Sequence, residues 1–300
     1  MRALVTGGSG YLGSRLALRL AESGWEVFVP CRQLGCLAQF SPLKNLNVFV
    51  SDNLRKEHFD FVRATKPEVV FHLASLFIGE HSPSDTERLV LSNILYGAQL
   101  LDACVDASAP YFVNTGSAWQ AYQGKTGSVP ANLYAGTKDA FESLLTFYCD
   151  ASLLSACTLR IPDTYGPGDP RGKLVSALVS SAYSGVELSL SPGRQELDLL
   201  YVDDVVSAFT AAAHLLIESP NTAAHSVFDI SSSAPISIVD LVELIRGLGV
   251  APSVRFGARP YRIREIMTPP RVLRPLKNWQ PVVSLEAGIG EMIKSYSARS

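Results

Sequence analysis

The chain has 300 residues, of which 47% are hydrophobic and 18% are charged, and its formal net charge is -2. This balance is typical of a globular protein with a large core and excludes an intrinsically disordered chain. The sequence has no basic run, so we expect no nucleic-acid partner.

Five cysteines stand at scattered positions. An odd, scattered set argues against a disulfide framework and for a reducing compartment, and its spacing does not suit a zinc site. No stretch reaches the roughly 18 apolar residues that span a membrane, and the apolar run after Arg2 is too short for an export signal. We therefore expect a cytoplasmic protein with no metal and no membrane partner.

Short apolar runs alternate with longer helical patterns over the first half of the chain. The expected strands cover 2–6, 26–31, 47–50, 69–73, 111–114 and 153–160. The expected helices cover 13–23, 56–66, 86–107 and 134–150. This alternation predicts an α/β fold with a doubly wound parallel sheet of the Rossmann type, and a ligand crevice at the carboxyl ends of the strands.

Proline and glycine become frequent after residue 161, which predicts a change of organisation. Residues 199–203 and 226–231 have the pattern of strands that return to the main body. We expect a cofactor-binding Rossmann domain over 1–166 and about 197–231. The other segments, about 167–196 and 232–300, are expected to form a smaller C-terminal substrate-binding domain.

The first expected strand runs into a glycine-rich turn, Thr6-Gly7-Gly8-Ser9-Gly10-Tyr11-Leu12-Gly13. Gly7, Gly10 and Gly13 allow a tight turn and a close approach of the main chain to a pyrophosphate. The helix that follows presents free N–H groups, those of Tyr11 and Leu12 among them, and the positive end of its dipole. Strand, turn, helix and second strand together predict a dinucleotide site.

The end of the second expected strand indicates which dinucleotide is bound. An Asp or Glu there bonds the ribose hydroxyl of NAD, whereas a basic residue accommodates the 2′-phosphate of NADP. This chain has Arg32 and no acid at that point, which favours NADP over NAD. Asp52 and Asn53, after the third strand, are candidates for the adenine amino group, and a helix cap explains Asp52 about as well.

Tyr134 and Lys138 are four residues apart and therefore share one helix face. The ammonium is expected to lower the pKa of the phenol from about 10. Lys138 is also expected to hold the nicotinamide ribose. A third hydroxyl is expected at the end of the preceding strand, where Thr115 is favoured over Ser117 as the group that binds the substrate oxygen. This catalytic set predicts redox chemistry.

These motifs resemble the extended short-chain dehydrogenases/reductases, the NAD-dependent epimerase/dehydratase family, in its nucleotide-sugar branch. Beyond the glycine turn and the Tyr134/Lys138 pair, the resemblance rests on His72-Leu73-Ala74, Asn93, Gly97, Arg160, Tyr165-Gly166-Pro167-Gly168, Tyr201-Val202-Asp203-Asp204, Trp279 and Pro281. It implies a homodimer formed through the helices over 86–107 and 134–150.

The resemblance also implies further contacts. Leu73, Ala74 and Ile161 are expected to touch the cofactor, and Asn93 and Tyr165 the substrate. Arg262 is the candidate for the substrate diphosphate, because a guanidinium can bind two oxygens at once. Relatives commonly read Arg-Asp-Phe where this chain reads Leu197-Asp198-Leu199, and Arg194 is the expected replacement for the missing arginine.

Two features of the resemblance concern the reaction. Dehydratases of the family follow the catalytic threonine with an Asp-Glu pair, which the stretch Thr115-Gly116-Ser117 does not provide. The segment over 256–267, together with Trp279, resembles the CDP-abequose and CDP-paratose synthases, which reduce a 4-keto sugar. We expect NADPH-dependent reduction of the C4 ketone of a nucleoside-diphosphate 4-keto-6-deoxyhexose, in deoxysugar biosynthesis. The alternatives are an NAD-dependent nucleotide-sugar 4-epimerase, a reductase of a non-sugar ketone and a non-catalytic NADP-binding regulator.

Overall fold

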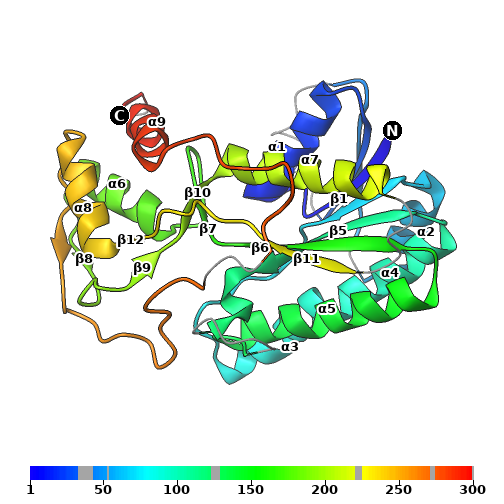
Figure 1. Ribbon diagram of the computed structural model, residues 1–300, viewed down its shortest axis with the longest axis horizontal. Helices are drawn as coiled ribbons and strands as arrows, with labels where there is room; N and C mark the ends of the chain where they lie inside the picture. The colour runs from blue at the N-terminus through cyan, green and yellow to red at the C-terminus, as the bar shows by residue number, and fades with distance from the viewer. Residues whose placement is uncertain (33–42, 53, 123–128, 220–224, 271–273, 299–300) are drawn as a thin grey trace.

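The computed structural model describes residues 1–32, 43–52, 54–122, 129–219, 225–270 and 274–298. Its centre is a seven-stranded sheet in the order β11-β6-β5-β4-β1-β2-β3 (Figure 1). Every neighbouring pair in this sheet is parallel. The strands are β1 (Arg2–Thr6), β2 (Glu26–Cys31), β3 (Leu46–Val50), β4 (Val69–His72), β5 (Tyr111–Ser117), β6 (Ser155–Ile161) and β11 (Ser226–Asp229). The order reverses between β1 and β4, so the predicted doubly wound fold is confirmed.

Helices cover both faces of this sheet (Figure 1). On one face lie α1 (Tyr11–Glu22) and α7 (Val202–Glu218), and on the other lie α2 (Lys56–Thr65), α4 (Tyr96–Asp106) and α5 (Leu133–Ala151). Each face has its own apolar core. Leu16, Val205 and Phe209 are fully buried in the first, and Leu100 and Leu145 in the second.

The expected helix over 86–107 consists of three segments without a break. These are α3 (Thr86–Val90), the π-helical turn η3 (Leu91–Leu95) and α4. Two short 3-10 helices, η2 (Pro83–Asp85) and η4 (Ala118–Gln120), follow the carboxyl ends of β4 and β5. Gly97 is required where α4 crosses α5, because a Cβ there would collide with the ring of Phe141.

The remaining elements gather at the left of Figure 1, beside the carboxyl ends of the strands. They are β7 (Asp163–Tyr165), α6 (Leu174–Ser184), β8 (Leu188–Ser189), β9 (Glu196–Leu197), β10 (Leu199–Tyr201), β12 (Ile236–Ser237), α8 (Ile238–Gly247), β13 (Val254–Arg255) and α9 (Leu285–Ser297). They enclose a third apolar cluster, in which Leu178, Leu241 and Ile289 are fully buried. None of the helices in the described ranges is long and apolar enough to cross a membrane.

The two expected strands after residue 161 have different outcomes. β11 joins the main sheet beside β6, as predicted, whereas β10 pairs with β7 in a separate two-stranded sheet. The expected strand over 199–203 ends at Tyr201, because Asp203 and Asp204 lie in the first turn of α7, where carboxylates stabilise a helix. Asp204 is buried, and its carboxylate accepts the N–H groups of Val282 and Val283 at 3.0 and 3.1 Å.

The glycine turn between β1 and α1 is packed against its own main chain. A Cβ at Gly13 would collide with the carbonyl oxygen of Gly7. Gly7 itself has a φ of 70°, and a Cβ there would lie 2.6 Å from the amide nitrogen of Ala74. The turn therefore tolerates no side chain at either position.

Substitution Gly13→Ala is expected to lower the free energy of unfolding by about 1–3 kcal/mol, because overpacking forces the backbone apart. The matched control is Gly290→Ala in helix α9, where a Cβ would meet nothing within 4 Å. This control should raise stability by about 0.5–1 kcal/mol through helix propensity. Urea unfolding of both variants measures the difference, and equal effects would contradict the packing of the turn.

Candidate active site

The glycine turn and the N-terminus of α1 form a cradle at the carboxyl edge of the sheet. The N–H of Gly10 donates to the carbonyl of Gly7 at 2.9 Å, which closes the turn. Leu73 and Ala74 follow β4 and lie against Gly7. No side chain among the described residues caps α1, and its first turn holds no acid. The N–H groups and dipole of this helix end thus suit the pyrophosphate of a dinucleotide.

The adenosine end of the predicted cofactor site is only partly described. Arg32 is exposed directly after β2. Asp52 has a side chain that is 62% exposed and accepts the N–H of Leu54 at 3.3 Å, a local turn contact. Asn53 lies outside the described residues. Cys31 is disulfide-bonded, whereas Cys104, Cys149 and Cys157 are free and buried.

Tyr134 lies in the first turn of α5, whose N-cap is Asn132. The hydroxyl groups of Ser75 and Ser117 face its phenol closely enough to lower its pKa. Burial raises the pKa of Tyr134 to about 12, and the two serine hydroxyls partly offset that rise. The expectation of a lowered pKa is therefore wrong for the protein alone, because desolvation outweighs the lowering effects of the two serines and of the charge of Arg171. The phenol is protonated at neutral pH.

Ser117, rather than Thr115, is the strand hydroxyl that meets Tyr134. Thr115 is buried and lies two residues before the carboxyl end of β5. Its Oγ1 donates to the carbonyl of His72 on β4 at 2.8 Å. Ser117 is the last residue of β5 and contacts the phenol. Thr115 therefore already has a main-chain partner for its hydroxyl, and the assignment of the substrate-binding hydroxyl stays a prediction. Ile161 pairs with Ser117 in the register of β5 and β6, at the same edge of the sheet.

Lys138 lies one helical turn beyond Tyr134 and is only 3% exposed. Its Nζ atom is 5.9 Å from the centre of the Tyr134 ring. Burial lowers the pKa of Lys138 to about 8, and the carboxylate of Glu142 opposes that shift. Glu142 is one turn further along α5 and bonds Arg160, whose Nη2 lies 3.1 and 3.2 Å from its two oxygens.

An aromatic wall, formed by Phe77 and Trp119, stands beside Tyr134. The ring of Phe77 packs edge-on against Tyr134 at 4.9 Å and against Trp119 at 5.6 Å between ring centres. The guanidinium of Arg262 lies 5.7 Å from the centre of the Trp119 ring and pairs with Glu80 at 2.7 Å. Arg262 therefore reaches the rim of the site from the C-terminal segment.

The other predicted substrate contacts lie elsewhere. Asn93 is 2% exposed. Its Oδ1 accepts the main-chain N–H of Leu76, in the loop after β4, at 2.7 Å. Its Nδ2 donates to the carbonyl of Leu76 and to Oγ1 of Thr137 in α5, both at 3.0 Å. Tyr165 is buried in the third apolar cluster against Tyr201. Both side chains are thus engaged in protein contacts here, and their contact with a substrate stays a prediction. Arg194 is exposed, and its main-chain N–H donates to the hydroxyl of Tyr261 at 3.2 Å.

Four residues beside the site were missed from the sequence. Ser75 contacts the phenol, the charge of Asp163 acts on it, and Gln120 and Glu142 lie behind Ser117 and Lys138. Ser75 and Asp163 come two or three residues after a strand of the sheet. Their position at strand ends was the available signal, since ligands bind there in α/β sheets.

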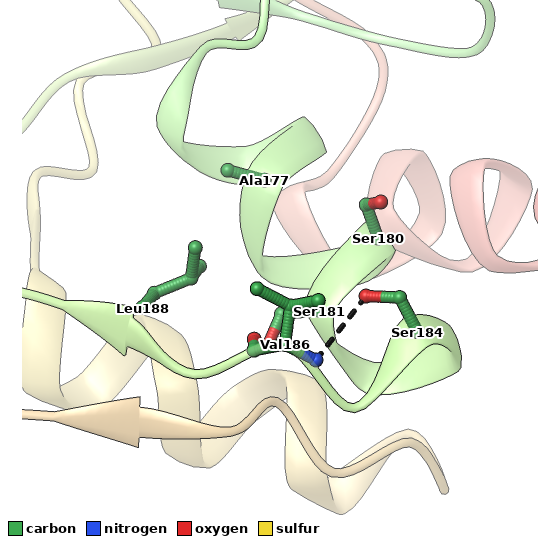
Figure 2. Close-up of a pocket in the computed structure, with 6 residues that line it drawn as sticks. All are labelled: Ala177, Ser180, Ser181, Ser184, Val186 and Leu188. Carbon is green, nitrogen blue, oxygen red and sulfur yellow. Dashed lines mark hydrogen bonds between the residues drawn. The ribbon is translucent and has the colours of Figure 1, made fainter.

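Figure 2 shows a cavity of about 270 Å³ that belongs to a different part of the molecule. It is lined by Ala177, Ser180, Ser181, Ser184, Val186 and Leu188. None of these is a candidate residue, and all come from α6, the segment after it and the first residue of β8. Over the described ranges, no group of three or more His, Cys, Asp or Glu side chains is placed to hold a metal ion.

The doubly wound sheet and its glycine cradle define a Rossmann-type α/β protein. The family model "NAD dependent epimerase/dehydratase family" matches residues 3–224, and the chain belongs to this family. It is 28% identical to the CDP-abequose synthase of Yersinia pseudotuberculosis over 69% of this chain and 71% of that protein. It is also 28% identical to the UDP-glucose 4-epimerase of Mycolicibacterium smegmatis, over the full length of both.

Solved structures agree with the fold. The UDP-glucose 4-epimerase of Thermus thermophilus, in complex with NAD, superposes with a TM-score of 0.84 at 25% identity. That comparison covers 100% of both chains.

Substitution Glu142→Gln removes the charge that opposes the effect of burial on Lys138. We expect the pKa of Lys138 to fall below about 8, because desolvation of the ammonium then acts with less opposition. The ¹³Cε resonance of Lys138, assigned by Lys138→Arg, gives this value directly. Glu243→Gln on the exposed part of α8 is the control, and an unchanged pKa in Glu142→Gln would contradict the described electrostatics.

Proposed function

We propose that this chain is an NADPH-dependent 4-ketoreductase, acting on a nucleoside-diphosphate 4-keto-6-deoxyhexose. The observation that carries the proposal is the buried cluster of Ser117, Tyr134 and Lys138 beside the glycine cradle. The family match and the CDP-abequose synthase relatives support a nucleotide-sugar substrate.

The residues of the cradle suit a dinucleotide. The N-terminus of α1 would hold its pyrophosphate, Lys138 its nicotinamide ribose and Arg32 its 2′-phosphate. When bound, NADPH supplies the hydride that C4 of the sugar receives. The charge and the proton at the C4 oxygen are then managed by the chain's own side chains.

Ser117 donates a hydrogen bond to the C4 carbonyl oxygen and thereby orients the ketone. As C4 is reduced, Tyr134 transfers its proton to that oxygen, and the ketone becomes an alcohol. A phenol that stays protonated at neutral pH is suited to this role of acid. The positive charge of Lys138 then stabilises the phenolate that remains.

Arg262 is proposed to bind the substrate diphosphate. In the structure its guanidinium is paired with Glu80, and the diphosphate would take the place of this exposed carboxylate. Arg194 is proposed as a second contact from the same side. The elements outside the sheet thus supply the nucleotide-binding part, and the helices over 86–107 and 134–150 are proposed to form a homodimer.

A nucleotide-sugar 4-epimerase is the second candidate function. It is supported by the full-length match to the UDP-glucose 4-epimerase of Mycolicibacterium smegmatis. Arg32, in place of an acid after β2, favours NADP and therefore the reductase. A 4,6-dehydratase is disfavoured whichever hydroxyl acts, because Ser117 is followed by Ala118 and Trp119 rather than by two acids.

Substitution Tyr134→Phe tests the proposed function. It removes the proton donor and retains the ring, so kcat for the 4-keto sugar should fall by about 10²- to 10⁴-fold while the Kd for NADPH stays unchanged. CDP-, UDP- and dTDP-linked substrates are assayed by NADPH absorbance. Tyr183→Phe on α6 is the control, and full activity of Tyr134→Phe would overturn the assignment.

Substitution Arg32→Glu tests the cofactor. A charge-assisted contact contributes about 1.5–3 kcal/mol, so the ratio of NADPH to NADH affinity should fall by roughly 10- to 100-fold. Arg19→Glu, on the exposed face of α1, makes the same change in charge away from the carboxyl edge. Titration calorimetry with both cofactors measures the ratio, and tighter binding of NADH by the unmodified protein would favour the epimerase.

A further inference from the structure

Gln120 is fully buried behind Ser117, and every polar atom of its side chain has a partner. Its Oε1 accepts the main-chain N–H of Ser117 at 2.7 Å. Its Nε2 donates to Oδ1 of Asp139 at 2.7 Å and to Oε2 of Glu142 at 3.0 Å. Ionised carboxylates only accept hydrogen bonds, so the amide has one possible orientation.

The groups around Gln120 leave its amide no second position. Glu142 is itself held by the guanidinium of Arg160. On the other side, Gly116 packs so closely that a Cβ would lie 2.9 Å from Oε1 of Gln120 and 2.7 Å from Cγ2 of Thr158. A buried amide with three well-made hydrogen bonds and no free space is a rigid support.

Gln120 and Ser117 also form a capping box around η4. The Oγ of Ser117 accepts main-chain N–H groups of η4, including that of Trp119 at 3.2 Å, while Gln120 returns a bond to the main chain of Ser117. A hydroxyl has one hydrogen and two lone pairs. Because its lone pairs face these N–H donors, its hydrogen is directed away from η4. Ser117 is thereby prepared as a donor on the side of Tyr134.

We propose that Gln120 is a positioning residue, which fixes the main chain of Ser117 against the Glu142–Arg160 pair and so presents the serine hydroxyl as a hydrogen-bond donor. Gln120 does not touch the substrate in this account and acts through Ser117 alone. The inference rests on the proposed reductase function, in which that hydroxyl binds the C4 oxygen.

A double-mutant cycle tests whether Gln120 acts through Ser117. Gln120→Met should lower kcat by about 10- to 100-fold through misplacement of the donor, with the KM for NADPH unchanged. In a Ser117→Ala background the same substitution should cost less than about twofold, since the group it positions is gone. An equal loss of kcat in the wild-type and Ser117→Ala backgrounds, or no loss in the wild-type background, would overturn the positioning role of Gln120. Gln99→Met on α4 is the control for loss of a partly buried glutamine.

A measurement without substrate separates this inference from the proposed function. The ¹³Cζ resonance of Tyr134, assigned by Tyr134→Phe, reports the hydrogen bond with Ser117. Ser117→Ala and Gln120→Met should move it in the same direction, and an unmoved resonance in Gln120→Met would overturn the inference. A wild-type protein that reduces no 4-keto sugar overturns the function, yet this resonance still decides the role of Gln120.

Gln120→Glu serves as the second variant where Gln120→Met does not fold. An ionised carboxylate at this position would face Asp139 and Glu142 and lose both donated bonds. Once protonated, it again offers one donor and one acceptor. The kcat of Gln120→Glu relative to wild type should therefore rise as the pH is lowered, and a ratio that does not change with pH would overturn the proposal.

Discussion

The site depends on one physical constraint, the burial of an ammonium group. Lys138 is 3% exposed, and removing its charge from water lowers its pKa to about 8. The opposing charge comes from Glu142, one helical turn away, which is itself buried and neutralised by Arg160. A buried charge is tolerated only where others compensate it. Lys138, Glu142 and Arg160 therefore join α5 to β6 beneath the site.

The same polar cluster supports the hydroxyl groups above it. Gln120 connects Glu142 to the main chain of Ser117, and Ser117 meets the phenol of Tyr134. The open side of the site is aromatic, because the ring of Phe77 packs against Tyr134. The site thus has a buried polar base held by the hydrogen bonds of Gln120 and Glu142, and a rim supplied by segments distant in sequence. A reaction that needs a donor and an acid aimed at one oxygen is served by such a base.

Local patterns were sufficient to predict the sheet, because strands and helices of a doubly wound fold alternate in hydrophobic period. Strands β1 and β2 were predicted with their observed bounds, and the helices differ from expectation mainly at their ends. The strand end that matters most was missed. β5 extends to Ser117, three residues past the expected end at Asn114, because it pairs with β6 over its whole length. That pairing places Ser117 at the very end of β5 and Thr115 within it.

Contacts between distant segments explain the other differences. Asn93 is polar and belongs to a family motif, but its burial follows from the loop after β4 and from α5 folding over it. Tyr165 is buried by Tyr201 and by helix α9, more than 100 residues further along. The raised pKa of Tyr134 likewise depends on the desolvation that the folded site imposes. None of these environments is encoded in a local pattern.

The most direct test of the account is the fate of the transferred hydrogen. The protein is given a nucleoside-diphosphate 4-keto-6-deoxyhexose and NADPH deuterated at C4 of the nicotinamide, on each face in turn, and the sugar product is examined by mass spectrometry and NMR. The account predicts one deuterium at C4 of the sugar from one of the two labelled cofactors, with one NADPH consumed for each product. The contradicting result is no deuterium at C4 and no consumption of NADPH, together with interconversion of a 4-hydroxy nucleotide sugar and its C4 epimer when that sugar is supplied instead. This would indicate an epimerase that returns the hydrogen from a retained cofactor.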